Sequence, residues 1–263
     1  MNIKFYKYQG AGNDFILVDN RKNVVNHQNP ALIARLCDRR FGVGGDGMMF
    51  LQEKTGYDFE MVYYNADGQP SSMCGNGGRC ITAFAHQLNL IQDKASFKAI
   101  DGPHEALITT HSPLAVKLKM SDVDEPELIG EDVFLNTGSP HYVRFVDNVS
   151  DLEIIYEAQK VRYNDRFRKE GTNVNFVQPL ENILIVRSYE RGVEDETYSC
   201  GTGVVGSVLA SVAKEIVPSS GKQTVHTKGG ILRVYYERDG NGFKNVWLEG
   251  EATFVFTGEI EID

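Results

Sequence analysis

The sequence predicts an α+β protein of two similar halves, each dominated by strands and containing one main helix. The chain has 263 residues, which is enough for one large domain or two of about 130 residues. Two Cys-Gly-x-Gly segments begin at Cys74 and Cys200, and each runs into a stretch of small residues typical of a helix. These cysteines are 126 positions apart, close to half the chain, as expected for a duplicated domain.

A second pair of segments repeats at nearly the same spacing. Residues 10–15 (Gly-Ala-Gly-Asn-Asp-Phe) and residues 138–143 (Gly-Ser-Pro-His-Tyr-Val) are each followed by a largely apolar triplet. Asn13 and His141 are 128 positions apart, within two residues of the cysteine spacing. Asn65 and Arg191 each stand nine positions before their cysteine, which is a weaker correspondence. We expect a domain boundary in the polar, acidic residues 121–126, with one domain at 1–120 and the other at 121–251.

Hydrophobic patterns place strands and helices in the same order in each half. Residues 57–64 alternate apolar and polar side chains before a turn, as a half-buried strand does. Residues 30–39 place Leu32, Ile33 and Leu36 on one helical face, and residues 78–90 form a mostly apolar helix suited to burial within a sheet or barrel. Further strands of this half are expected at 2–5, 15–19, 96–100, 105–110 and 115–120.

The second half contains one expected helix, at residues 203–214, directly after the second thiol segment. Its strands are expected at 134–136, 142–145, 173–178, 183–189, 223–228, 231–236, 245–249 and 252–261.

A thiol placed just before a helix lies beside backbone N–H groups without intrahelical acceptors and beside the positive end of the helix dipole. Both features lower a thiol pKa and favour the thiolate. Glycines after Cys74 and Cys200 give the backbone freedom to direct several N–H groups at one anion. Either loop alone could be a tight strand-to-helix turn, but two equivalent loops favour a pair of reactive thiols. Cys37 and Cys80 lie on apolar helical faces and are interpreted as small buried side chains.

Other uses of two cysteines fit the pattern less well. A zinc site would need further Cys or His ligands at close, regular spacing, which Cys74 and Cys80 do not provide. A redox dithiol usually has Cys-x-x-Cys spacing, although a Cys74–Cys200 disulfide remains possible as an inactive form. Neither loop ends in Gly-Lys-Ser or Gly-Lys-Thr, as a nucleotide phosphate loop would.

Composition describes an ordinary globular protein. The net charge is −9 with both signs interspersed, so nucleic acid is not expected as a partner. No apolar run approaches the length needed to cross a bilayer, and the first ten residues read as a strand and not as a secretory signal. Four cysteines in a chain of this length favour a reducing cytoplasm.

Seven ordered motifs resemble those of the diaminopimelate epimerase family over nearly the whole chain. They are Gly10-Ala11-Gly12-Asn13-Asp14-Phe15, Gly42-Val43-Gly44-Gly45-Asp46-Gly47, Asn65-Ala66-Asp67-Gly68, Met73-Cys74-Gly75-Asn76-Gly77-Gly78-Arg79-Cys80, Gly138-Ser139-Pro140-His141, Asn173-Val174-Asn175-Phe176, and Glu190-Arg191-Gly192 leading to Cys200-Gly201-Thr202-Gly203.

The resemblance implies two pseudo-symmetric domains, each a strongly curved, mostly antiparallel sheet or barrel around a central helix. It also implies a site in the cleft between them and a C-terminal strand, 252–263, that packs back on the first domain. The implied reaction interconverts LL- and meso-2,6-diaminopimelate, for lysine and peptidoglycan precursor synthesis, without pyridoxal phosphate, metal or other cofactor. A homodimer is implied as well.

The family pattern implies roles for individual residues. Cys74 and Cys200 would be the catalytic pair, with Cys200 as base toward the LL substrate and Cys74 as the proton donor. Backbone N–H groups at the two helix ends would bind the reacting carboxylate, and other polar residues would lie beside the reacting centre or hold the distal end of the substrate. The first set is Gly75, Asn76, Gly201 and Thr202; the second is His141 and Glu190, with Glu190 also binding substrate; the third is Asn13, Asn65, Asn173 and Arg191.

One departure and two alternatives accompany this interpretation. Many relatives carry Asn where this chain has Ser139, so the corresponding ligand contact is in doubt or passes through water. Proline racemases and hydroxyproline epimerases resemble the fold, but they typically carry His at the position of Asn76 and Asp-x-Ser-Pro before the second thiol, where this chain has Glu-Thr-Tyr-Ser at 196–199. A dithiol redox protein or a small-anion-binding protein would need the thiols but no proton exchange.

Overall fold

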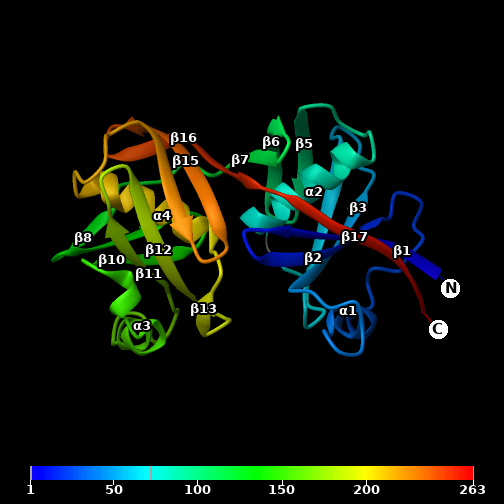
Figure 1. Cartoon of the computed structure of the whole chain (residues 1–263), viewed down its shortest axis with the longest axis horizontal. Helices are drawn as coiled ribbons and strands as arrows, with labels where there is room; N and C mark the ends of the chain where they lie inside the picture. Colours follow the sequence, from blue (N-terminus) through cyan, green and yellow to red (C-terminus); the bar gives the residue numbers. More distant parts are fainter. Residues whose placement is uncertain (1, 72, 263) are drawn as a thin grey trace. The chain divides into compact units, whose positions relative to one another are not determined.

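The structure is a computed structural model that describes residues 2–71 and 73–262. The chain divides into two compact units, drawn in Figure 1. Unit 1 comprises Met1–Leu118 and Gly250–Asp263, and unit 2 comprises Lys119–Glu249.

Unit 1 is built on a sheet in which β17 pairs with β1 and the strands then follow in the order β1-β2-β3-β4-β5-β6-β7. The pairs β2–β3 and β4–β5 are parallel and the other pairs are antiparallel. Its elements are β1 (Asn2–Gly10), β2 (Asn13–Asp19), α1 (Pro30–Cys37), β3 (Gly47–Gln52), β4 (Phe59–Asn65), α2 (Gly75–Gln87), β5 (Lys94–Ala99), β6 (Gly102–His111), β7 (Leu114–Lys119) and β17 (Thr253–Glu261).

Unit 2 follows the same plan. Its strands pair in the order β8-β9-β10-β11-β12-β14-β15, with the short β13 also paired to β12. Its elements are β8 (Glu127–Ile129), β9 (Asp132–Asn136), β10 (Pro140–Phe145), the 3-10 helix η1 (Val149–Asp151), α3 (Ile154–Arg162), β11 (Asn173–Pro179), β12 (Ile183–Glu190), β13 (Asp195–Thr197), α4 (Gly201–Ala213), β14 (Gly221–Thr227), β15 (Gly230–Asp239) and β16 (Gly242–Glu251).

The two units share one pairing pattern, which confirms the predicted fold class. The series β1-β2-β3-β4-β5-β6 corresponds to β9-β10-β11-β12-β14-β15, and the parallel pairs β2–β3 and β4–β5 match the parallel pairs β10–β11 and β12–β14. Helix α1 corresponds to α3, and the 13-residue helix α2 corresponds to the 13-residue helix α4. Each long helix contacts at least five strands of its own unit.

Each sheet carries a helix on both faces at its centre. In unit 1, Ile16 of β2 and Met48 of β3 pack with α1 in one core cluster, while a Cβ on Gly77 of α2 would meet Met49 on the other face. Since neighbouring residues of a strand point to opposite faces, β2 and β3 are buried on both sides.

The same alternation in unit 2 positions polar side chains next to α4. Val174 and Phe176 of β11 pack with α3 in an apolar cluster. Asn173 and Asn175 therefore point to the other face of the strand, where the side-chain oxygen of Asn175 lies against Gly203 of α4. Strand alternation thus brings two buried amides to the beginning of α4.

Several predicted elements differ from those observed. Helices α2 and α4 begin at Gly75 and Gly201, earlier than the predicted starts at residues 78 and 203, because tertiary packing overrides the poor helix propensity of glycine. Helix α1 ends at Cys37, two residues before the predicted end. The prediction lacked α3, β3, β8 and β13.

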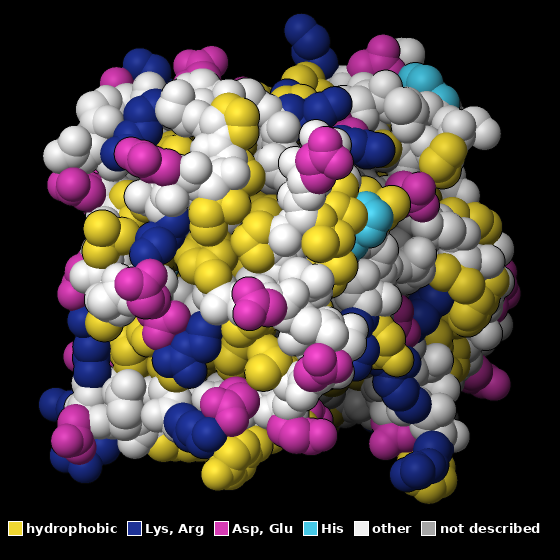
Figure 2. Space-filling model, turned by 60° about the vertical axis from the view of Figure 1, so that its left-hand side comes forward, with side chains coloured by type: hydrophobic (Ala, Val, Ile, Leu, Met, Phe, Trp, Pro, Cys, Tyr) yellow, Lys and Arg dark blue, Asp and Glu magenta, His cyan; other side chains and the backbone are white. Residues whose placement is uncertain are grey.

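Charged side chains of both signs are mixed on the surface, as the composition predicts. Over the face shown in Figure 2, basic and acidic side chains are interspersed. Among the residues described, none of the helices has the length and apolar character needed to span a membrane. Cys37 and Cys80 are buried, as predicted, and burial raises the pKa of each thiol to about 12.

Candidate active site

Cys74 and Cys200 occupy the same position in their units: each is the N-cap of a long buried helix. Both have extended backbones, with φ/ψ of −106°/129° and −104°/109°, and neither sulfur makes a capping hydrogen bond. The Cys74 and Cys200 carbonyls accept the first helical bonds, from the N–H groups of Gly78 and Val204 at 2.7 and 2.8 Å. N–H groups in a first helical turn lack intrahelical acceptors, so each cysteine lies at an end suited to anions.

Around Cys74, a β-hairpin and the first turn of α2 bring three predicted residues together. Ala11 and Gly12 both have positive φ, which gives a tight turn between β1 and β2 and places Asn13 directly after it. Asn13 Oδ1 lies 3.6 Å from Cys74 Sγ and 3.4 Å from Asn76 Nδ2. Cys74 is therefore in contact with an amide oxygen.

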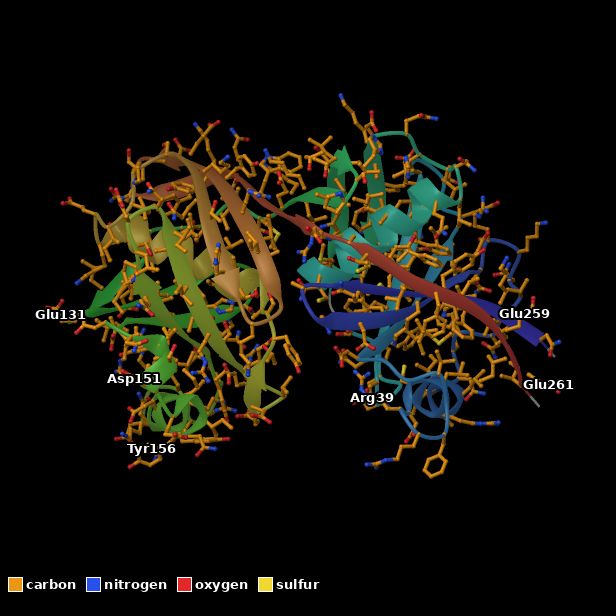
Figure 3. The ribbon with its side chains drawn as sticks, viewed as in Figure 1. Arg39, Glu131, Asp151, Tyr156, Glu259 and Glu261 are labelled. Carbon is orange, nitrogen blue, oxygen red and sulfur yellow. The ribbon has the colours of Figure 1, made fainter. Side chains whose placement is uncertain are left out.

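Asn13 is hydrogen-bonded to a cluster of charged side chains. Its Nδ2 donates to Asp46 Oδ2, and Arg39, labelled in Figure 3, pairs with Asp46 at 2.8 Å and with Asp14 at 2.6 Å. Lys7 pairs with Asp14 at 2.6 Å. Burial opposes the ionisation of Asp14, but hydrogen bonds from Arg39 and Lys7 outweigh it and lower the Asp14 pKa to about 2. Asp14 therefore stays ionised, and the hydrogen bond to Asp46 keeps Asn13 in one orientation.

Arg79 lies one turn into α2 and is completely buried. Its Nη2 donates to Asn76 Oδ1 at 2.8 Å and its Nη1 to the Gly75 carbonyl at 3.3 Å. Burial lowers the pKa of Arg79, an effect that the nearby Cys80 and Cys74 oppose. The side chain therefore sets the orientation of the Asn76 amide behind the helix end.

Around Cys200, hydroxyl groups take the place that Asn13 occupies beside Cys74. Thr202 Oγ1 is 3.5 Å from Cys200 Sγ and 3.3 Å from Ser139 Oγ. Ser139 Oγ is also 2.9 Å from His141 Nε2. The residue at which this chain departs from the family pattern thus links His141 to the helix end.

His141 is fully buried in β10, and its other ring nitrogen lies 3.1 Å from Asn175 Nδ2. Burial lowers the pKa of His141 to about 3, and the positive charge of Arg191 acts in the same direction. The imidazole is therefore neutral at physiological pH.

The neutral state of His141 makes stability depend on pH. The unfolded chain protonates this histidine near pH 6.5, so the unfolded state binds more protons between about pH 6.5 and pH 3. The free energy of unfolding must fall as the pH drops through that range. We expect His141 to account for a loss of about 2 kcal/mol between pH 7 and pH 5. Urea denaturation at both pH values measures it, and His141→Gln should remove that part of the slope. Equal slopes in the two proteins would contradict the assignment.

Asn173, Glu190 and Arg191 lie at neighbouring strand ends of unit 2. The backbone N–H of Arg191 donates to Asn173 Oδ1 at 2.9 Å, and Asn173 Nδ2 donates to the Pro140 carbonyl at 3.0 Å. The guanidinium of Arg191 donates to the Glu170 carbonyl at 2.8 Å. Thr197 donates its hydroxyl to Glu190 Oε1. Asn173 is buried, whereas the Arg191 side chain is exposed.

Each unit thus gathers its own predicted residues. Unit 1 brings together Asn13, Cys74, Gly75 and Asn76; Asn65 is exposed at the end of β4, where its backbone forms a turn with Gly68 and Gln69. Unit 2 brings together His141, Asn173, Glu190, Arg191, Cys200, Gly201 and Thr202.

Asp46, Arg79 and Asn175 are among the residues of these networks that had no predicted role. Two of them left a signal in the sequence. Arg79 is a charge within an otherwise apolar helix, and Asn175 stands two positions after Asn173, on the same face of a strand. Asp46 lies in the glycine-rich motif at residues 42–47, but only the fold brings it into contact with Asn13.

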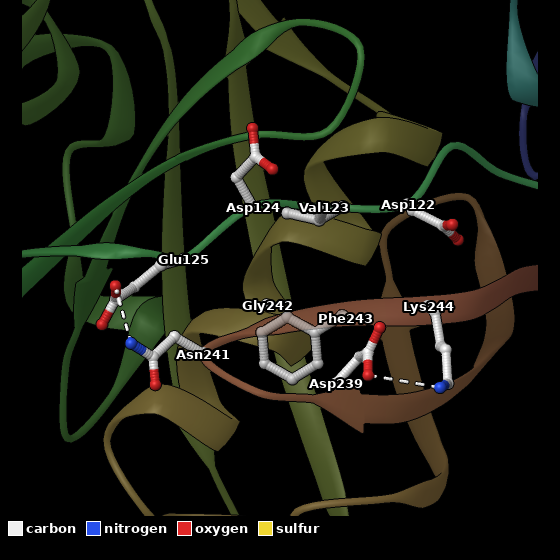
Figure 4. A pocket seen from close by; sticks show the side chains of 9 residues that line it. All are labelled: Asp122, Val123, Asp124, Glu125, Asp239, Asn241, Gly242, Phe243 and Lys244. Atoms are coloured by element: carbon white, nitrogen blue, oxygen red, sulfur yellow. Dashed lines mark hydrogen bonds and ion pairs between the residues drawn. The ribbon is translucent and has the colours of Figure 1, made fainter.

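A pocket elsewhere in unit 2 contains none of the predicted residues. Figure 4 shows it between the segment before β8 and the β15–β16 turn, with Asn241 donating to Glu125 at 3.0 Å and Lys244 paired with Asp239 at 3.2 Å. Within residues 2–71 and 73–262, no group of three or more His, Cys, Asp or Glu side chains is arranged to hold a metal ion.

Comparison with known proteins finds one matching family and several solved structures with a similar fold. The family model described as diaminopimelate epimerase matches residues 5–123 and 133–255. A diaminopimelate epimerase of Flavobacterium psychrophilum is 48% identical over 255 residues, covering 97% of this chain and 98% of the relative. The fold is similar to a PhzF-family phenazine biosynthesis protein of Bacillus anthracis, with a TM-score of 0.74, 14% identity and full coverage of both chains. A hydroxyproline epimerase of Agrobacterium vitis has a TM-score of 0.70 and 10% identity, with 98% of this chain and 91% of that chain covered.

Proposed function

The chain belongs to the diaminopimelate epimerase family, and we propose that it interconverts LL- and meso-2,6-diaminopimelate in lysine and peptidoglycan precursor synthesis. The observation that carries this proposal is the equivalent placement of Cys74 and Cys200, each at the N-terminus of a buried helix with polar partners beside the sulfur. The reaction requires no pyridoxal phosphate and no metal ion.

The chemistry needs a base and an acid that act on opposite faces of one carbon. The α-proton of an amino acid is only weakly acidic, so a positioned thiolate removes it while a thiol returns a proton from the other side. Cys200 is the base toward the LL substrate and Cys74 is the proton donor; the reverse reaction exchanges their roles. Titration of two such thiols is coupled, because one proton is shared between the pair in each resting state.

The N-termini of α2 and α4 stabilise the carbanion. Backbone N–H groups of Gly75, Asn76, Gly201 and Thr202 bind the reacting carboxylate and take up charge as it becomes enolate-like. The positions of these residues in the first turns of α2 and α4, which begin at Gly75 and Gly201, support this assignment. His141 and Glu190 lie beside the reacting centre, and Glu190 also contacts substrate.

Selectivity for diaminopimelate needs groups that hold its distal amino and carboxylate ends. We assign this role to Asn13, Asn65, Asn173 and Arg191. The exposed guanidinium of Arg191 and the exposed side chain of Asn65 support it, because a ligand can reach both. Asn13 contributes through the amide that also contacts Cys74.

We propose that the enzyme is located in the cytoplasm and that it forms a homodimer. Exposed apolar side chains at Phe254, Val255 and Phe256 of β17 support self-association. Light scattering of the purified protein tests the dimer, and fractionation of cells that produce it tests the location.

Incubation with each diaminopimelate isomer in heavy water tests the reaction. We expect α-deuterium to appear together with inversion, because the proton that returns comes from a solvent-exchanged thiol. Proline under the same conditions should remain unlabelled. Failure to label diaminopimelate would exclude the proposed function, and racemisation of proline would select the proline racemase type instead.

A further inference from the structure

A series of hydrogen bonds in unit 2 leads from the buried β11 strand to the sulfur of Cys200, and the direction of each bond can be assigned. The first member is the Asn175 amide. Its Nδ2 faces the Tyr142 carbonyl at 3.4 Å, which can only accept, and its Oδ1 accepts from the Ser188 hydroxyl at 2.8 Å. Nδ2 is therefore also the atom that donates to His141 Nδ1.

This donor determines the tautomer of His141. The buried imidazole is neutral, so only one of its nitrogens carries a proton. Nδ1 accepts from Asn175 at 3.1 Å, which places the proton on Nε2. His141 Nε2–H consequently donates to Ser139 Oγ at 2.9 Å.

Ser139 receives a second donor from Asn173. The Asn173 amide is oriented at both ends, since its Oδ1 accepts from the Arg191 N–H and its Nδ2 donates to the Pro140 carbonyl. The same Nδ2 lies 3.3 Å from Ser139 Oγ. Two donors occupy both lone pairs of the hydroxyl, so its own proton points to Thr202 Oγ1 at 3.3 Å.

Thr202 then has its hydroxyl proton available for Cys200 Sγ at 3.5 Å. A hydrogen bond donated to sulfur stabilises the charged form of the thiol. With Thr202 as the donor to Cys200, every bond from Asn175 onward has the same direction and ends on this sulfur. Burial of Asn175 and His141 keeps the series in one arrangement.

Beside Cys74 the neighbouring side-chain atom is a hydrogen-bond acceptor, whereas beside Cys200 it is a donor. Asp46 accepts from Asn13 Nδ2, so Asn13 turns its Oδ1 toward Cys74 Sγ at 3.6 Å. The Arg79 guanidinium, which can only donate, turns Asn76 Oδ1 inward and leaves Asn76 Nδ2 to donate to the same Asn13 oxygen. An acceptor next to sulfur favours the protonated thiol.

We propose that the resting enzyme holds Cys200 as thiolate and Cys74 as thiol, with Ser139 and His141 as positioning residues that act on Cys200 through Thr202. Only the catalytic interpretation of these protonation states rests on the proposed function, because the states themselves can be measured without substrate. It predicts that the empty enzyme is prepared for the LL isomer, whose α-proton Cys200 removes.

Carbamidomethylation across a pH series tests the proposal. The thiolate sulfur displaces iodide from iodoacetamide and forms a carbon–sulfur bond, and peptide mass spectrometry follows Cys74 and Cys200 separately. The midpoint pH of each reaction reports ionisation even where burial slows the rate. We expect Cys200 to have the lower midpoint. In Thr202→Val, which keeps the side-chain shape, that midpoint should rise by about one pH unit, whereas Thr202→Ser should retain it.

A distant variant separates the series from a local effect of the Thr202 hydroxyl. Ser139 does not contact Cys200, yet Ser139→Ala should also raise the Cys200 midpoint, because Thr202 would no longer be oriented. The charged groups on neighbouring elements, Glu190, Arg191, Glu194, Glu196 and Lys228, are the same in all these variants.

Two results would overturn the proposal: a Cys74 midpoint below that of Cys200, or an unchanged Cys200 midpoint in Thr202→Val. Deuterium exchange in the wild-type protein is scored independently. An enzyme that labels diaminopimelate but ionises Cys74 first would therefore retain the proposed function and lose this inference.

Discussion

Replacement of Cys200 or Cys74 by alanine should lower kcat/KM for epimerisation by about 10³-fold, the contribution expected of a positioned acid or base. In the proposed mechanism each turnover needs both thiols, one to remove the α-proton and one to return a proton from the opposite face. Neither variant should invert the substrate at an appreciable rate, and the double variant should incorporate no α-deuterium. A coupled assay for the meso isomer, together with mass spectrometry in heavy water, measures both quantities.

Cys37→Ala provides the matched control. Cys37 is a buried cysteine of unit 1, but it lies at the end of α1 and packs in the apolar cluster on the face of the sheet that α1 covers. Its replacement should leave kcat/KM within a few-fold of wild type. Inversion that persists in Cys74→Ala or Cys200→Ala above one-hundredth of the wild-type rate, an order-of-magnitude threshold, would contradict a two-thiol mechanism.

Gly203→Ala should lower the free energy of unfolding by about 3 kcal/mol, the combined cost of overpacking and of disturbing a buried hydrogen bond. A Cβ at this position would lie 2.4 Å from Asn175 Oδ1 and 3.2 Å from the Cys200 Cβ. Asn175 cannot move away readily, because Ser188 and Tyr142 hold both ends of its amide. Urea denaturation measures the loss, and the pH midpoint of Cys200 alkylation should change with it.

Gly206→Ala is the control within the same helix. There a Cβ would lie 3.4 Å from the nearest atom, His141 Cβ, which is ordinary contact. Alanine also forms helix more readily than glycine, so this variant should be neutral or more stable by about 0.5–1 kcal/mol. Equal destabilisation by the two substitutions would show that the helix as a whole, and not the Asn175 contact, excludes a side chain.

The sequence predicted most elements, and its internal repeat points to two of those it missed, β3 and α3. Residues 47–52 are apolar without alternation, because β3 is buried on both faces and a period of two is absent. Shifting β3 by the cysteine spacing of 126 gives residue 173, where a strand was predicted and β11 begins. The same shift places a partner for α1 near residue 156, within α3.

The sequence predicts where the candidate residues stand relative to helices and strands, but it does not predict the direction of their hydrogen bonds. The placement of Cys74 and Cys200 before helices follows from the local sequence. By contrast, Ser139 was expected to reach ligand through water, if at all, while its contacts with His141 and Thr202 require three separate elements to be in place. The direction of each hydrogen bond depends on all the groups in the folded network, so the spacing of residues in the sequence does not predict it.

The pairing of β17 with β1 has a consequence for synthesis on the ribosome. Residues 119–249 form a unit that is continuous along the chain, whereas β1 obtains its second partner strand only when residues 253–261 have emerged. Unit 2 can therefore fold while β1 still exposes an unpaired edge, since domains generally fold as they emerge. Cys74, which is translated before Cys200, thus belongs to the unit that is completed last. A nascent chain that stalls before β17 has the helix that follows Cys74 but an incomplete sheet in the same unit.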